Sequence, residues 1–186
     1  MKRRMTIFGT GMAIVAPAAV GAQVYLREAD AARAIFPEST SAVRKVMELT
    51  DAELESLSRV LGRRVEVRSY PYLEVRSEAG DAGDIFILEV IGQSLPITFA
   101  VGVAPDGALK DVQVMVYREP HGDEIENERF RRQFAGKRLQ DPVALGKDID
   151  AISGATISSA SATYAARKGL ALADLLRKRA APRTKP

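Results

Sequence analysis

Two nearly continuous apolar runs in the middle of the chain place the strongest constraint on its fold. They are DIFILEVIG at residues 84–92 and LPITFAVGV at residues 95–103. Runs of this length and composition are typical of strands that are buried on both faces. A turn signal, PDG at 105–107, is followed by the alternating segment DVQVMVYRE at 111–119. We therefore expect an antiparallel hairpin in this part of the chain.

Two alternating segments precede these runs, at residues 63–70 and 72–78, and we expect both to be strands. The strands follow one another without the regular strand–helix alternation of a dinucleotide-binding fold, and the chain has neither G-x-G-x-x-G nor a P-loop. The predicted fold class is α+β. We expect a single domain with an antiparallel-rich sheet of four to five strands and flanking helices against one face.

Four segments have helical patterns. Residues 39–49 and 50–62 are expected to form two short helices, the second opened by a capping box of Thr50 and Glu53. Residues 124–134 are expected to form a charged helix with Ile125, Phe130 and Phe134 inward. Residues 157–179 predict a longer helix, whose expected buried residues are Tyr164, Ala165, Leu172, Leu175 and Leu176.

The first 22 residues resemble an export signal. Lys2, Arg3 and Arg4 precede an apolar segment at 5–21, and small residues at 20–22 suit cleavage before Gln23. An uncleaved N-terminal membrane anchor is the alternative, because the apolar segment is only slightly shorter than a span of ~20 residues. Either way, we expect the protein in the periplasm or on the envelope side of the inner membrane.

Composition excludes several classes of site. The chain has no cysteine and a single histidine, His121, so disulfides, thiolate metal sites, cysteine nucleophiles and multi-histidine zinc or haem sites are excluded. Of the 27 basic residues, three precede residue 5 and five lie from Arg177 onward, which leaves 19 against 24 acidic residues between them. No nucleic-acid partner is expected for such a surface.

The segment DIDAISGATISSAS, at 148–161, places several hydroxyls where the long helix begins. Gly154 lets the chain turn where a side chain would obstruct it. The helix start then presents unpaired N–H groups to an anion, most often a phosphate. Ser153, Thr156, Ser158 and Ser159 could each add a hydrogen bond to that anion. The alternative is a helix start with more capping residues than it needs.

Residues 150–156 resemble the D-x-x-[S/T]-G-A-T flavinylation motif of FMN-binding domains. Such domains occur in one component of the sodium-translocating NADH:quinone reductase, in one component of the Rnf complex and in the N-terminal part of nitrous-oxide-reductase regulatory proteins. In that family the last threonine carries FMN through a phosphoester bond. The resemblance implies that Thr156 carries covalent FMN and that the surrounding cofactor site includes Asp150, Ser153, Gly154, Ala155 and Ser158.

The resemblance also implies partners. A flavin transferase would install FMN after export, using FAD and magnesium, and Asp150 would help to position the magnesium ion or to activate Thr156. His121 and Glu124, in REPHGDEI at 118–125, lie where related domains have an acidic segment near the flavin, although this sequence lacks the H-x-E-T-P-G form of the quinone-reductase proteins. His121 could hydrogen-bond the flavin ring or relay a proton; exposed loop residues are the alternative for both.

The resulting interpretation divides the chain into a signal peptide or anchor (1–22), a helical lead-in (23–62), an FMN-binding domain (63–179) and a basic tail (180–186). The expected function is electron relay between membrane or periplasmic redox proteins, without catalysis of its own. A sensory or regulatory module with non-covalent FMN is one alternative. A hydrolase with Ser153 or Thr156 as nucleophile is another, although G-x-S-x-G and a second histidine are missing.

Overall fold

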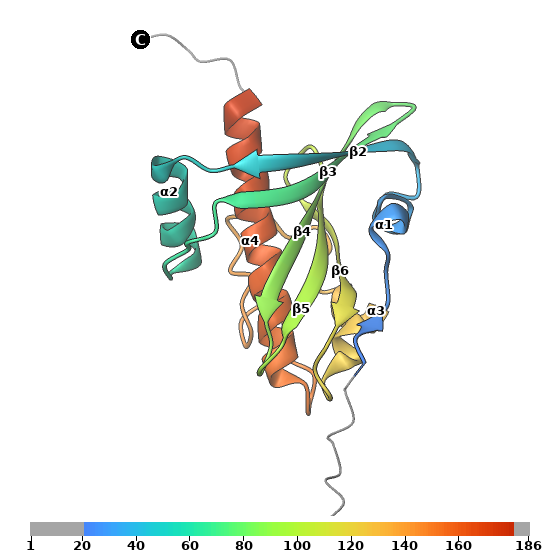
Figure 1. The fold of residues 1–186 in the computed structure, drawn as a ribbon, viewed down its shortest axis with the longest axis vertical. Helices are drawn as coiled ribbons and strands as arrows, with labels where there is room; N and C mark the ends of the chain where they lie inside the picture. The colour runs from blue at the N-terminus through green and yellow to red at the C-terminus, as the bar shows by residue number, and fades with distance from the viewer. Residues whose placement is uncertain (1–20, 181–186) are drawn as a thin grey trace, which may run out of the picture.

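The computed structural model describes residues 21–180, in which one antiparallel sheet packs against a long C-terminal helix (Figure 1). The sheet has six strands in the order β1-β6-β5-β4-β3-β2. Its strands are β1 (Gln23–Val24), β2 (Ser39–Glu48), β3 (Ser69–Ser77), β4 (Gly80–Ile91), β5 (Pro96–Val103) and β6 (Leu109–Tyr117). The helices are α1 (Glu28–Ile35), α2 (Asp51–Leu61), the 3-10 helix η1 (Asp123–Glu126), α3 (Glu128–Arg131) and α4 (Thr156–Ala180). The predicted α+β class is confirmed, with more strands than expected.

The central strands are those that the apolar runs predict. β4 pairs with β5 from Asp84↔Val103 to Ile91↔Pro96, and the turn at 105–107 leads into β6, which pairs antiparallel with β5. Nearly all of β5 is buried. One face of β5 packs under α4, and Ala100 on the other face belongs to a second apolar cluster with α1. Burial on both faces explains why this strand lacks alternation.

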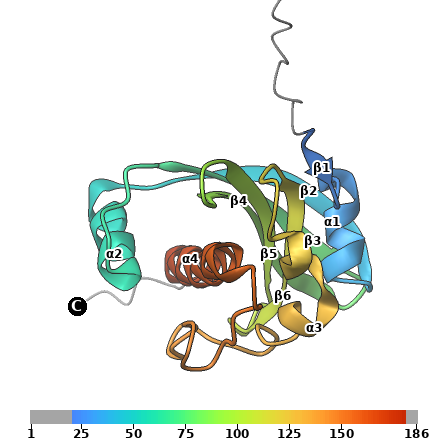
Figure 2. The ribbon, with the colours of Figure 1, turned by 90° about the horizontal axis from the view of Figure 1, so that it is seen from below.

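Helix α4 lies along the concave side of the sheet, between the sheet and α2 (Figure 2). Its inner face is rich in small residues, which let it approach the strands closely. A Cβ atom on Gly169 would lie 2.4 Å from Cγ1 of Val101 in β5, so only glycine fits at this crossing. The helix predicted at 157–179 is therefore confirmed, and Thr156 is its first residue. Of its expected inward residues, Tyr164 and Leu176 are half-buried and the others are buried.

The segment predicted as a helix at 39–49 is a strand. β2 pairs with β3 along its length, and Val43 and Val46 are about half exposed while Met47 is buried. Apolar residues at this spacing fit one face of a helix, but the edge of β3 offers nine paired positions, and β-branched residues suit a strand. The lead-in at 23–62 is thus only partly helical, and it contributes β1 and β2 to the sheet. The second predicted helix is confirmed as α2, with its Thr50–Glu53 capping box.

Helices cover both faces of the sheet, which corrects the expectation of one covered face. The unexpected helix α1 packs Ala31, Ala32 and Ile35 on the face opposite α4. The strand expected at 63–70 begins only at Ser69, and residues 64–68 have no regular structure. In the register with β2, pairing starts at Ser69, opposite Glu48.

The helix expected at 124–134 is broken into η1, α3 and a run of turns that ends near Gly136. Its predicted inward residues Ile125, Phe130 and Phe134 are all buried. Most of the predicted signal peptide or anchor, and the basic tail beyond residue 180, lie outside the described residues. None of the helices formed by residues 21–180 combines the length and hydropathy that a membrane crossing needs.

Candidate functional site

The start of α4 is built by a tight turn at Ser153–Gly154. Gly154 has φ of 85°, in the left-handed region that favours glycine. The Ala155 N–H donates to the Ile152 carbonyl at 3.0 Å, and the first helical bond runs from Ser159 N–H to the Ala155 carbonyl at 2.8 Å. Within residues 21–180, no backbone acceptor pairs with the N–H groups of Thr156, Ile157 and Ser158. The first turn has no acidic residue, so this helix end favours an anion.

The hydroxyls at the helix start divide into buried and exposed ones. Ser159 is fully buried; its Oγ accepts from Ile152 N–H at 3.2 Å and donates to the Ala155 carbonyl at 2.8 Å, which stabilises the turn. Ser158 is also buried, and its Oγ lies 2.7 Å from the Tyr117 hydroxyl. Ser153 and Thr156 are exposed, and in the described part of the chain neither side chain makes a hydrogen bond. Thr156 is therefore the free hydroxyl that opens the helix.

Tyr117 joins the helix start to the loop that carries His121. Its phenol donates to the His121 carbonyl at 2.5 Å, so it accepts from the Ser158 hydroxyl. Gly122 follows with φ of 96°, and a Cβ atom there would lie 2.5 Å from Ser158 Oγ. The sequence gives no local sign of this role for Tyr117, because Ser158 is 41 residues away.

A cavity of about 250 Å³ opens between this loop, the β4–β5 turn and the helix start. Five of the predicted site residues line this cavity, namely His121, Gly154, Ala155, Thr156 and Ser158. The other four lining residues were not predicted from the sequence. The whole lining consists of Gln93, Glu119, His121, Gly122, Gly154, Ala155, Thr156, Ile157 and Ser158.

Glu119, which also lines this cavity, is buried. Its carboxylate accepts from the backbone N–H groups of Ser94 at 2.5 Å and Leu95 at 2.8 Å. Burial raises the pKa of Glu119, but these N–H donors outweigh burial and hold its pKa below the usual value. The side chain is thus an ionised anchor for the β4–β5 turn.

A second cavity, of about 480 Å³, is lined in part by residues 150–152, which precede the turn at Ser153–Gly154. Two predicted site residues, Asp150 and Glu124, line this cavity and not the first. Both are exposed. Ser153 lines neither cavity and lies at the exposed turn between them. The structure therefore does not bring the Asp150 carboxylate and the Thr156 hydroxyl into one enclosed site.

Residues 92–171 match the model of the FMN-binding domain family. The match includes the His121 loop, the turn at Gly154 and most of α4.

Among solved structures, the fold resembles the crystal structure of Shewanella oneidensis NqrC. The TM-score is 0.54 at 18% sequence identity, and the alignment covers 80% of this chain and 88% of NqrC. No curated protein matches the sequence. At this identity the structural likeness concerns the fold.

Proposed function

We propose that this protein carries FMN through a phosphoester bond to Thr156 and relays electrons between redox partners. One observation carries the proposal: within residues 21–180, an exposed Thr156 hydroxyl that makes no hydrogen bond begins a 25-residue helix beside unpaired N–H groups, in a segment that matches the FMN-binding domain family. The D-x-x-S-G-A-T motif at 150–156 supports the covalent form of attachment.

The residues at the helix start fit an esterified phosphate. Such a phosphate keeps a negative charge, and the unpaired N–H groups and the positive end of the helix dipole both stabilise it. Thr156 lines the 250 Å³ cavity together with His121 and Gln93, so polar groups from three separate segments share one cavity with the attachment point. Bound FMN supplies the electron-transfer chemistry, and the protein supplies its placement and electrostatic surroundings.

Attachment requires Thr156 to act as a nucleophile toward FAD. A bond forms between the threonine oxygen and the phosphorus of the FMN half, the bond between the two phosphates breaks, AMP leaves and the hydroxyl proton passes to a base. A flavin transferase with magnesium provides this chemistry in the proposal. Thr156 is suited to it, because its exposed side chain is accessible to another protein. Asp150 is exposed and borders the 480 Å³ cavity rather than the cavity that Thr156 lines, which supports a role toward the metal or the transferase instead of the attached phosphate.

We place this electron carrier in the cell envelope. The positive-then-apolar segment at residues 2–21 supports export, and the motif supports membrane or periplasmic electron-transfer proteins as partners. Covalent attachment suits this setting, because a cofactor lost outside the cytoplasm has no local supply.

Co-expression with a flavin transferase tests the proposal. The purified chain is expected to be heavier by FMN minus one water, its denatured band to fluoresce under ultraviolet light, and the adduct to map to the peptide containing Thr156. Flavin that is lost on dialysis under denaturing conditions would instead indicate a non-covalent binding module. Chain expressed without the transferase serves as the control for adventitious flavin.

Gly154→Val is expected to reduce flavin loading because of backbone strain. A Cβ atom at this position meets nothing within 4 Å, so space is not the obstacle that the sequence suggests. The constraint is the φ of 85°, which costs a β-branched residue ~1–3 kcal/mol. Gly154→Asn is the matched control, since asparagine tolerates this conformation. The fraction of flavinylated chain, measured by intact mass, should fall for valine much more than for asparagine; equal loading would contradict this account of the turn.

A further inference from the structure

We propose that Gln133 is a positioning residue for flavin loading, because its side-chain amide fixes the backbone at the first residue of the motif. The inference rests on the proposed function and adds a residue that lies outside the motif. It starts from a two-point contact between Gln133 and Asp150, which are 17 residues apart in the chain.

The contact uses both polar atoms of the Gln133 amide. Oε1 accepts from the Asp150 N–H at 2.7 Å, and Nε2 donates to the Asp150 carbonyl at 3.2 Å. Both backbone groups of one residue are thus satisfied by one side chain, as they would be by a neighbouring strand. A side chain with one polar atom, or with none, cannot reproduce this pattern.

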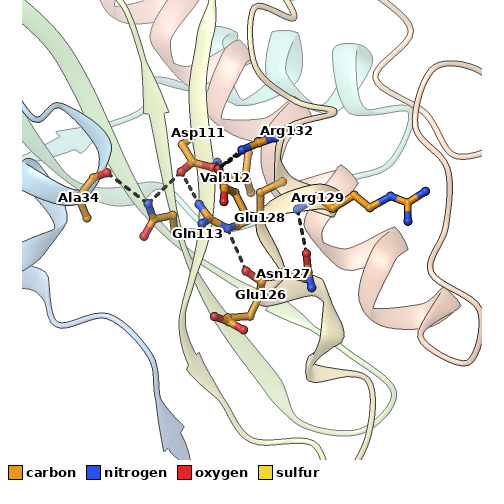
Figure 3. Close-up of polar contacts among 10 residues, drawn as sticks. Ala34, Asp111, Val112, Gln113, Glu126, Asn127, Glu128, Arg129 and Arg132 are labelled. Carbon is orange, nitrogen blue, oxygen red and sulfur yellow. Dashed lines mark hydrogen bonds and ion pairs between the residues drawn. The ribbon is translucent and has the colours of Figure 1, made fainter.

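The segment that carries Gln133 is itself firmly held. Phe130 and Phe134 are buried on either side of it, with their rings edge to face at 5.4 Å between centroids. Between them, Arg131 forms an ion pair with Asp111 of β6, and its Nε donates to the Glu126 carbonyl at 3.0 Å. The polar contacts of this segment with β6 are drawn in Figure 3, where Asp111 also contacts Gln113, which reaches Ala34 of α1. Gln133 therefore belongs to a segment that buried side chains and an ion pair hold against β6.

The contact matters because it fixes one of the two ends of the motif. The other end is fixed by Ser159, which bonds Ile152 N–H and the Ala155 carbonyl, and by the Ser158–Tyr117 contact. Between these anchors, the Asp150 carboxylate makes no ion pair or hydrogen bond among the described residues and borders the 480 Å³ cavity. With both ends held, the turn offers Thr156 and Asp150 to the transferase in one arrangement, so the bound chain reaches the reacting geometry without further ordering.

Two substitutions separate positioning from packing. Gln133→Met keeps the length of the side chain and removes both hydrogen bonds. Gln133→Glu keeps an acceptor for the Asp150 N–H and loses the donor to its carbonyl. With purified transferase and FAD, we expect the kcat of loading to fall ~10–100-fold for methionine, as for other misplaced reacting groups. KM should change little, and glutamate should recover part of the loss.

Amide hydrogen exchange gives a readout that does not depend on the transferase. The Asp150 N–H should exchange faster in Gln133→Met than in wild type, and glutamate should restore protection, while the urea midpoint stays close to wild type for both. Gln140→Ala is the matched control, because Gln140 is an exposed glutamine that borders a different cavity. Wild-type loading by Gln133→Met would overturn this inference alone, whereas absence of an adduct on wild type would overturn the proposed function and this inference with it.

Discussion

Thr156→Ala is expected to abolish the covalent flavin adduct while the domain stays folded. The side chain is exposed and makes no hydrogen bond within residues 21–180, so its loss removes the nucleophilic oxygen and little else. Truncating a hydroxyl at a helix start typically costs ~1 kcal/mol. Intact mass should show no FMN increment after co-expression with the transferase, and the urea midpoint should shift only slightly.

Neighbouring hydroxyls provide the controls for Thr156. Thr156→Ser keeps a hydroxyl at the same place and should retain part of the loading. Ser153→Ala should lower loading without moving the adduct. Ser159→Ala should chiefly lower stability, because its Oγ holds the turn together. An adduct that peptide mapping places on Ser158 or Ser159 would mean that the helix start is the attachment site but Thr156 is the wrong oxygen.

Lys168→Met is expected to stabilise the protein at neutral pH. Lys168 lies on the inner side of α4 with 6% of its surface exposed, and its Nζ is 4.6 Å from the centroid of the Tyr70 ring. Among the described residues no carboxylate pairs with it. Burial, with a smaller effect from Arg63, lowers the pKa of Lys168 to about 8. Methionine keeps the length of the side chain and removes the buried charge, so the free energy of unfolding should rise by ~1–3 kcal/mol.

The pH dependence follows from the direction of this pKa shift. Between about pH 8 and the ordinary lysine value of 10.5, the unfolded chain binds a proton that the folded chain has released. The free energy of unfolding contributed by Lys168 therefore rises with pH across this window. Buried tyrosines with raised pKa values, such as Tyr70, act in the opposite sense near pH 10, so the quantity to measure is the difference between wild type and Lys168→Met.

That difference should be largest below pH 8 and should shrink toward pH 10.5 in urea titrations. Lys178→Met is the control, because Lys178 is an exposed lysine on the same helix whose surface ion pair with Asp174 contributes less than ~1 kcal/mol. A Lys168→Met protein that is less stable than wild type at pH 7 would show that the contact of the ammonium group with the Tyr70 ring outweighs the cost of its burial.

Local patterns were sufficient to predict the centre of this fold. The apolar runs, the turn at 105–107 and the capping box at Thr50 each depend on residues that are close in sequence. β2 could not be predicted in this way, because its apolar spacing fits a helix equally well and only pairing with β3 distinguishes the two. Helix α1 depends similarly on a sheet face that forms from distant strands.

The residues of the candidate site could likewise be predicted only where they depend on residues that are close in sequence. Thr156 and its turn could be found from a contiguous motif, because the helix start needs neighbouring residues. Tyr117 and Gln133 act on that motif from 41 and 17 residues away, through contacts that no periodicity encodes. The same holds for Glu119, whose place in a loop suggests a solvated acid although backbone N–H groups surround it.

The close crossing of Gly169 and Val101 sets the axial register of α4 against the sheet. A helix can slide along its axis only by moving its side chains past those of the surface beneath it, about 1.5 Å for each residue of shift. Here Val101 occupies the gap left by the missing side chain, so such a slide would drive it into a neighbouring residue of the helix. Thr156 begins the same helix, and a redox group tied to it would keep a constant distance from the strands through every cycle of oxidation and reduction.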